Sequence, residues 1–379
     1  GRGMDAAVID AAMTFARRRD YGEQDLGHYG LGLKAASLSQ ADVLDVLSRA
    51  VGGVPVGRRI AKDRPTRVET LDPRQVGESL AAPLFRIPGA SPSHGTVVRW
   101  HDVRTALSSP DPDERAEWLS GCIEEVRAHL GLVFHRILER SAVEVSVDEF
   151  DLDIGEAGAM RRVQVLDPLA RGVTGVRPIP LDGAVNGRPF ELTGVVLTER
   201  ALQDPAILAS ARGSAAANGQ GLYIYRRDRL LQIGGWDSII REGRDWEYLR
   251  ISLDIDDALL DVVQVNPEKS GVVLDADMRR AVHSAVDGDG RSFADLLDRA
   301  RSAASEARRR TRRPIALVEP GRGLSRQMYD AVADAVEFAE ADPVDIRWRR
   351  LPGTSLVDVD VEQRTLWLND LYRPVLSGS

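Results

Sequence analysis

A glycine-rich stretch near the amino terminus contains the residues best suited to chemistry. Its glycines have the spacing GxxGxG and fall at Gly27, Gly30 and Gly32. Glycine permits positive φ and has no Cβ that would keep a ligand away from the backbone. A helix-favouring run follows directly, and successive backbone N–H groups at the start of a helix form an anion site. The stretch therefore predicts a loop that could hold a polyphosphate, although the same spacing also occurs where a helix simply begins.

Two common phosphate-binding loops do not match this stretch. A P-loop requires GxxxxGK[ST], but here Leu33 separates Gly32 from Lys34, and Ala35 replaces the hydroxyl residue. A dinucleotide fingerprint places its glycines in the order GxGxxG after a strand. Here the order is different, and no strand is predicted before the loop. The sequence therefore excludes both readings.

The elements around the loop predict a first domain of mixed helices and strands. Apolar residues at helical spacing indicate a helix over 4–18, and a short second helix should end near residue 39. Residues 72–93 contain Pro73, Pro83, Pro88 and Pro92 and are expected to be irregular. A long helix is predicted over 111–140. Alternating apolar residues predict a strand at 42–50, and a turn at Gly52-Gly53 leads into a second strand at 54–60. Further strands are predicted at 66–71 and 95–100.

The sequence pattern changes after residue 140. Apolar and polar residues alternate over 143–154, as in a strand. Further short strands are predicted up to about residue 275, including a hairpin over 222–233 and a strand over 249–255. Residues 276–312 are expected to be mostly helical. The last segment predicts a helix over 324–340 and strands over 356–361 and 365–368. The predicted domains are 1–140, 141–313 and 314–379.

Composition limits the classes of protein to consider. The chain has 379 residues, 43% hydrophobic and 28% charged, with a formal net charge of −8. These values are typical of a globular protein and argue against a uniformly basic surface. The single Cys122 excludes an internal disulfide and a CxxC metal site, so a cytoplasmic location is expected. No apolar run reaches the ~18 residues of a membrane span, so no membrane partner is expected.

Three motifs in order resemble the GHKL ATPases, a family that includes gyrase B, MutL, the large heat-shock chaperones, histidine-kinase ATP domains and MORC proteins. They are Gly1-Arg2-Gly3-Met4, the loop from Gly27 to Lys34, and Gly95-Thr96. The loop with the following Ser37 is most similar to the MORC-like branch. The resemblance implies an α/β (α+β) fold class: a Bergerat-type ATP-binding α/β sandwich followed by a transducer-like α/β domain.

A fourth motif lies far downstream. The segment Asn266-Pro267-Glu268-Lys269 resembles the end of a MutL- or MORC-like transducer domain. The stretch from Gln220 to Trp236 also looks like that domain. The resemblance implies that Lys269 is catalytic and reaches the γ-phosphate of ATP.

The resemblance also implies a set of ATP contacts. Thr96 would hydrogen-bond in the adenine pocket, usually through water, and Lys34 would either add charge at the phosphates or be a surface lysine. The implied ATP-binding residues are Gly1, Gly3, Met4, Gly27, His28, Tyr29, Gly30, Leu31, Gly32, Leu33, Lys34 and Thr96.

This sequence departs from the family pattern at its start. The family's first helix carries a catalytic glutamate and an Asn or Asp that holds Mg²⁺, and its DxGxGM turn carries an adenine-binding aspartate. None of these has a counterpart here. We therefore expect a fragment of a longer protein, with the Mg²⁺ ligand in the missing helix. The fragment should bind nucleotide weakly, and the full-length parent should hydrolyse ATP.

The sequence leaves several functions open. One is an ATP-dependent homodimeric clamp acting on DNA, by analogy with MutL, gyrase and MORC. Its only local support is the arginine run 308–313 and the arginines of the 226–229 hairpin, although such a run is more often a solvated helix end. The alternatives are a chaperone-like protein remodeller and a non-hydrolysing, nucleotide-sensing scaffold. A histidine kinase fits less well because that module ends soon after the Gly-Thr strand.

Overall fold

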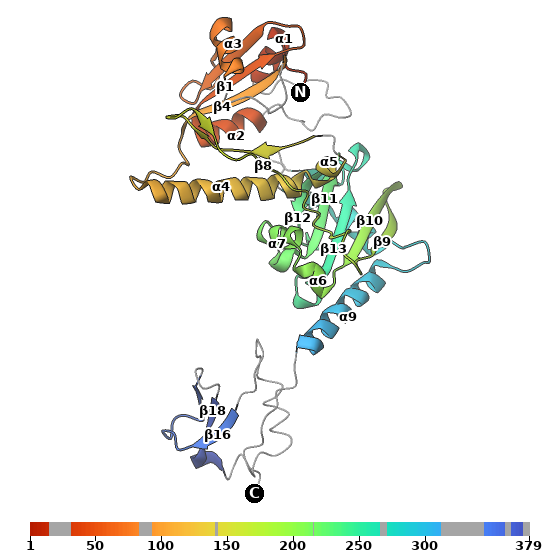
Figure 1. Cartoon of the computed structure of the whole chain (residues 1–379). Coiled ribbons are helices and arrows are strands. Elements are labelled where there is room, and N and C mark those ends of the chain that lie inside the picture. Colours follow the sequence, from red (N-terminus) through yellow and green to blue (C-terminus); the bar gives the residue numbers. More distant parts are fainter. Residues whose placement is uncertain are drawn as a thin grey trace. The chain divides into compact units, whose positions relative to one another are not determined.

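The structure is a computed structural model that describes residues 1–14, 32–82, 93–140, 143–214, 216–265, 271–311, 345–360 and 365–373. Contacts divide the chain into two units, residues 1–300 and 301–379. The described elements combine helices with antiparallel and mixed sheets (Figure 1), which confirms the predicted α/β class.

The first unit begins with a four-stranded antiparallel sheet of order β3-β2-β1-β4. The predicted hairpin around Gly52 and the Gly-Thr strand are both confirmed. The strands are β1 (Ala41–Arg49), β2 (Pro55–Ala61), β3 (Val68–Thr70) and β4 (Gly95–Val103). The helices that pack on this sheet are α1 (Ala6–Met13), α2 (Gly32–Gln40) and α3 (Pro73–Ala81).

The two faces of this sheet are covered by different helices. Alternation along β1 points Leu44 and Val46 to one face, where they form a core with Ile9 and Met13 of α1. Leu47 points to the other face, where Val76 of α3 approaches Gly57 so closely that an added Cβ would lie 2.6 Å from it. The glycine at 57 therefore allows α3 to pack directly on β2.

The helix α3 corrects the expectation that residues 72–93 are irregular. Asp72 caps the helix by accepting hydrogen bonds from the backbone N–H groups of Arg74 and Gln75, and Pro73 occupies the first turn. Proline is favoured there because the first helical N–H has no partner within the helix. Pro73 therefore starts a helix in this segment, while residues 83–92 lie outside the described residues.

A charged cluster occupies the same face as α3. The Asp45 carboxylate accepts two hydrogen bonds from Arg59, at 2.7 and 2.8 Å, and lies 2.8 Å from His101 Nε2. Burial alone would raise the pKa of Asp45, but the hydrogen bonds and charges of Arg59 and His101 lower it below its usual value. This cluster ties β1 to both of its neighbours in the sheet.

The predicted long helix over 111–140 is interrupted at Phe134. It consists of α4 (Pro112–Val133) and α5 (His135–Glu139), and Phe134 lies between them with φ −113° and ψ 16°. The break lets α5 contact a second sheet, where Arg136 stacks 3.5 Å from the ring centroid of Tyr225 and pairs with Asp254 at 2.5 Å. Helix α4 also contacts β12 (Arg229–Ile233) of this sheet and the helix α7 (Pro205–Arg212).

The second sheet is mixed, with the order β12-β11-β13-β10-β9. The predicted hairpin over 222–233 and the strand at 249–255 are confirmed; β11 and β13 pair in parallel. The strands are β9 (Pro178–Val185), β10 (Arg188–Val196), β11 (Gly221–Arg226), β12 (Arg229–Ile233) and β13 (Leu249–Asp254). The helices are α6 (Glu199–Leu202), α7 (Pro205–Arg212), α8 (Ala276–His283) and α9 (Phe293–Thr311).

One core fills the space between this sheet and the helices α8 and α9. Leu192, Ile251 and Met278 are fully buried in it. At Gly194 an added Cβ would lie 2.3 Å from Leu296, so α9 packs directly against the backbone of β10. The rest of the first unit holds small strand pairs: β5 (Ser146–Val147) with β8 (Arg161–Arg162), β6 (Phe150–Asp151) with β7 (Glu156–Ala157), and β14 (Val263–Val265) with β15 (Val272–Leu274).

The second unit contains a three-stranded sheet of order β16-β18-β17. Both predicted strands are present, as β17 (Val357–Asp360) and β18 (Thr365–Asn369); β16 (Asp345–Arg349) was not predicted. The buried Asn369 amide donates to the carbonyl oxygen of Ser355 at 2.8 Å and closes the loop before β17. The helix predicted over 324–340 lies outside the described residues.

Candidate functional site

The Gly3–Met4 turn lies against the end of β1. Gly3 has φ +72°, a conformation that side chains other than glycine rarely adopt, and a Cβ added there would lie 1.8 Å from the backbone oxygen of Arg49. Met4 donates its backbone N–H to Ser48 Oγ at 2.7 Å. The structure therefore gives a specific reason for glycine at position 3, namely close approach to β1.

Ser48 connects this turn to β4. Its Oγ lies 2.9 Å from the backbone oxygen of Gly95 and 2.7 Å from Thr96 Oγ1. Ser48 is fully buried, whereas Thr96 is exposed. Two of the predicted motifs, Gly3-Met4 and Gly95-Thr96, thus meet through one hydroxyl group, although Met4 and Gly95 are 91 positions apart in the chain.

Sequence reasoning missed Ser48. The signal was present, because Ser48 occupies the position after Leu44 and Val46 in the apolar alternation of β1. A hydroxyl group at a buried position needs a hydrogen-bond partner. Only the pairing of β1 with β4 shows that the partner is Thr96.

An apolar strip continues from Thr96 along β4. Val98 and Trp100 lie on the same face as Thr96 and are 46% and 43% exposed. A hydroxyl group beside exposed apolar side chains can receive the edge of a heterocycle while the strip contacts its ring. This arrangement suits a purine base.

The predicted phosphate loop is only partly described. Gly27, His28, Tyr29, Gly30 and Leu31 lie outside the described residues. Gly32 begins α2, an added Cβ there would meet nothing within 4 Å, and Leu33 is 39% exposed. Gly1 likewise has open space around it.

Lys34 is buried, which excludes the alternative that it is a surface lysine. It is 1% exposed, and its Nζ donates to the backbone oxygens of Ala12 and Thr14 at 2.8 and 2.9 Å. Burial lowers the pKa of Lys34 below its usual value. These carbonyls belong to the end of α1, so the lysine joins α1 to α2 and satisfies groups that a helix end leaves unpaired. Its predicted contact with phosphate remains a prediction.

The two remaining parts of the predicted site have no geometry in this structure. Lys269 lies outside the described residues, between β14 and β15 in sequence. Among the described residues, no group of three or more His, Cys, Asp or Glu side chains could hold a metal ion. The described side chains therefore do not form a Mg²⁺ site.

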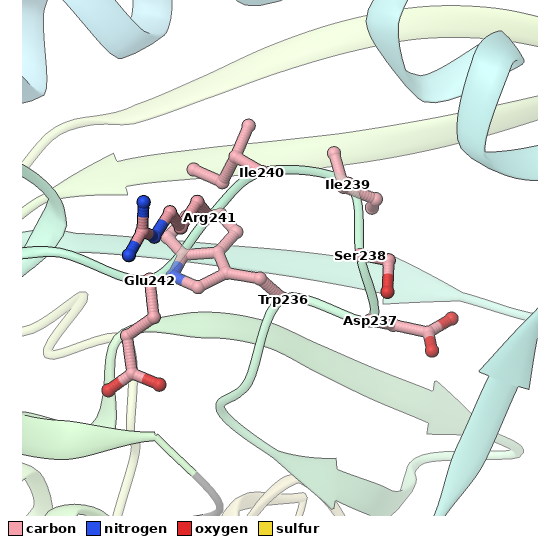
Figure 2. Close-up of a pocket in the computed structure, with 7 residues that line it drawn as sticks. All are labelled: Trp236, Asp237, Ser238, Ile239, Ile240, Arg241 and Glu242. Atoms are coloured by element: carbon pink, nitrogen blue, oxygen red, sulfur yellow. The ribbon is translucent and has the colours of Figure 1, made fainter.

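A shallow cavity of about 480 Å³ lies along the turn that follows β12. Figure 2 shows the Trp236 ring beside Arg241 and Ile240, with Asp237 and Ser238 farther along the turn. Trp236 Nε1 donates to Gln220 Oε1 at 3.0 Å, which anchors the turn to β11. None of the residues predicted to bind ATP lines this cavity.

A family model described as histidine kinase-, DNA gyrase B-, and HSP90-like ATPase matches residues 1–73. This segment is similar to GHKL ATPases. The matched range includes the Gly3–Met4 turn, the glycine-rich loop and Ser48, and it ends before Thr96. The match supports ATP binding by the GHKL-type domain and ATP hydrolysis as the general activity of the family. No curated protein matches the chain at a significant level.

Within the part of the chain that the structure describes, no helix has both the length and the apolar character needed to cross a membrane.

Proposed function

We propose that residues 1–140 bind ATP, with the base at Thr96 and the phosphates at the loop from Gly27 to Lys34. The observation that carries this proposal is the hydrogen-bonded connection from Met4 through Ser48 to Thr96. It joins the segment matched by the ATPase family to a strand outside the match, at the place where the resemblance puts adenine. The apolar strip of Val98 and Trp100 beside Thr96 gives the ring of a base a surface to contact.

The γ-phosphate contact is proposed for Lys269. A lysine that bonds only this phosphate strengthens ATP binding relative to ADP, since ADP lacks the group. Lys269→Ala should therefore lower the preference for ATP over ADP by about tenfold and leave ADP affinity unchanged. Isothermal titration, extended to millimolar nucleotide, measures both affinities.

The matched control is Lys62→Ala, which removes the same charge from an exposed position between β2 and β3. Equal ATP and ADP affinities in the unmutated chain would contradict the role of Lys269. Absence of any binding would contradict the whole site. ATP turnover, measured with and without Lys269→Ala, tests whether the same lysine also contributes to hydrolysis.

We further propose that ATP operates a homodimeric clamp on DNA. The support is the likeness of residues 1–73 to a family whose description includes DNA gyrase B. The hairpin arginines no longer contribute, because Arg226 and Arg227 pair with Asp257 at 2.5 and 3.1 Å, and Arg229 stacks over Phe134. The local support that the sequence offers is the arginine run 308–313.

The clamp proposal predicts DNA binding that weakens as salt concentration rises, because phosphate contacts release counterions. Filter binding at several salt concentrations measures the slope, and replacing Arg308, Arg309 and Arg310 by alanine should reduce it. Arg226 pairs with Asp257, so its replacement should remove no direct DNA contact and should leave the salt dependence of DNA binding unchanged. Binding to unfolded proteins with ATP-dependent suppression of their aggregation, and no affinity for DNA, would favour the chaperone-like alternative.

A further inference from the structure

The proton positions around Ser48 carry information about which base the site accepts. A serine hydroxyl has one proton to donate and two lone pairs that accept. Ser48 Oγ has three partners: the Met4 N–H, the Gly95 backbone oxygen and Thr96 Oγ1. The Met4 N–H can only donate, and the Gly95 oxygen can only accept.

These constraints assign the remaining bond. Ser48 uses one lone pair for the Met4 N–H and its proton for the Gly95 oxygen. The second lone pair is left for Thr96, so all three bonds form only when Thr96 donates its proton to Ser48. The 2.7 Å separation of the two hydroxyl oxygens fits this O–H···O bond. Since Ser48 is fully buried, water does not offer it another partner.

We propose that Ser48 is a specificity-determining residue, which holds the exposed Thr96 hydroxyl as a hydrogen-bond acceptor and thereby selects a 6-amino purine over a 6-oxo purine. Thr96 has spent its only proton on Ser48 and presents lone pairs to the ligand. The exocyclic amino group of adenine donates, whereas the 6-oxo group of hypoxanthine or guanine accepts and would face those lone pairs. An unpaired polar group in a binding site is costly, so the selection is against the oxo base.

This inference rests on the proposed ATP site and makes a separate claim about it. The probes are ATP and ITP, because the base of ITP has an oxo group in place of the 6-amino group and carries a proton at N1. We expect the unmutated chain to prefer ATP by about tenfold. Ser48→Ala frees the Thr96 proton, so the hydroxyl can donate as well as accept. The ratio of the two dissociation constants should then fall toward one.

The decisive control is a double-mutant cycle with Thr96→Val. Because Ser48 acts through the Thr96 hydroxyl, Ser48→Ala should change the ATP-to-ITP ratio in the unmutated background and leave it unchanged beside Thr96→Val. A merely structural role would weaken both nucleotides together and leave the ratio constant. Thr96→Ser keeps the hydroxyl and should keep the preference, which tests the assignment even if Ser48→Ala does not fold.

Three results would overturn the inference. One is an unmutated chain that binds ATP and ITP equally, and another is a ratio unaffected by Ser48→Ala in a folded protein. The third is a Thr96→Val variant that retains the full preference. In each case ATP still binds, so the proposal that residues 1–140 bind ATP stands, whereas binding of neither nucleotide overturns both proposals.

Discussion

Gly3→Ala is expected to destabilise the first domain by about 2–4 kcal/mol and to weaken ATP binding by about tenfold or more. The new Cβ would lie 1.8 Å from the Arg49 backbone oxygen, and position 3 has φ +72°. Relief of this clash must move the turn away from β1, which pulls the Met4 N–H from Ser48 Oγ. Urea unfolding measures the first effect, and nucleotide titration measures the second.

Gly52→Ala separates the clash from the backbone conformation. Gly52 has φ +68°, close to that of Gly3, but an added Cβ there meets nothing within 4 Å. This variant should lose only about 1 kcal/mol, the cost of a left-handed conformation for a side chain, and should bind ATP normally. Equal losses in the two variants would show that approach to β1 is unimportant for the site.

Arg250→Ala is expected to cost about 3–5 kcal/mol of stability in the unit that contains β13. Arg250 is the second residue of β13, and its exposed fraction is 0%. Its guanidinium donates to the backbone oxygens of Glu247 and Leu249 at 2.9 and 3.1 Å, and also to that of Asn218. Burial lowers the pKa of Arg250 because it disfavours the charged guanidinium. The bonds to the carbonyl oxygens offset part of this cost.

Two further variants make the Arg250 prediction specific. Arg250→Met retains most of the side-chain volume and removes the donors, so its loss of about 1–3 kcal/mol reports the carbonyls left unpaired. Arg241→Ala removes an exposed arginine of the same domain and should change stability by no more than about 0.5 kcal/mol. Thermal and urea unfolding distinguish the three. A loss for Arg250→Ala as small as that for Arg241→Ala would contradict the structural role.

Local patterns predicted most of the strands around the site. Alternation in β1 and β4, and the glycines at 52 and 53, depend on neighbouring residues and are readable from the chain. The same reasoning failed at α3, where Pro73 was counted as a helix breaker although it stands in the first turn. Local patterns also did not reveal the helix break at Phe134. After this break, α5 makes tertiary contacts such as the stacking of Arg136 on Tyr225.

The sequence by itself determined which motifs are present and their order, because glycine spacing and the Gly95-Thr96 pair are properties of the chain. Only the tertiary structure decided how they act together. The pairing of β1 with β4 gives Thr96 its partner Ser48, and the approach of Gly3 to Arg49 makes glycine necessary there. The tertiary structure also determined that Lys34 donates hydrogen bonds to the backbone carbonyls at the end of α1. Hydrogen bonds between distant residues depend on how the strands and helices pack, so the glycine-rich loop could be recognised from sequence while the partners of Ser48 and Lys34 could not.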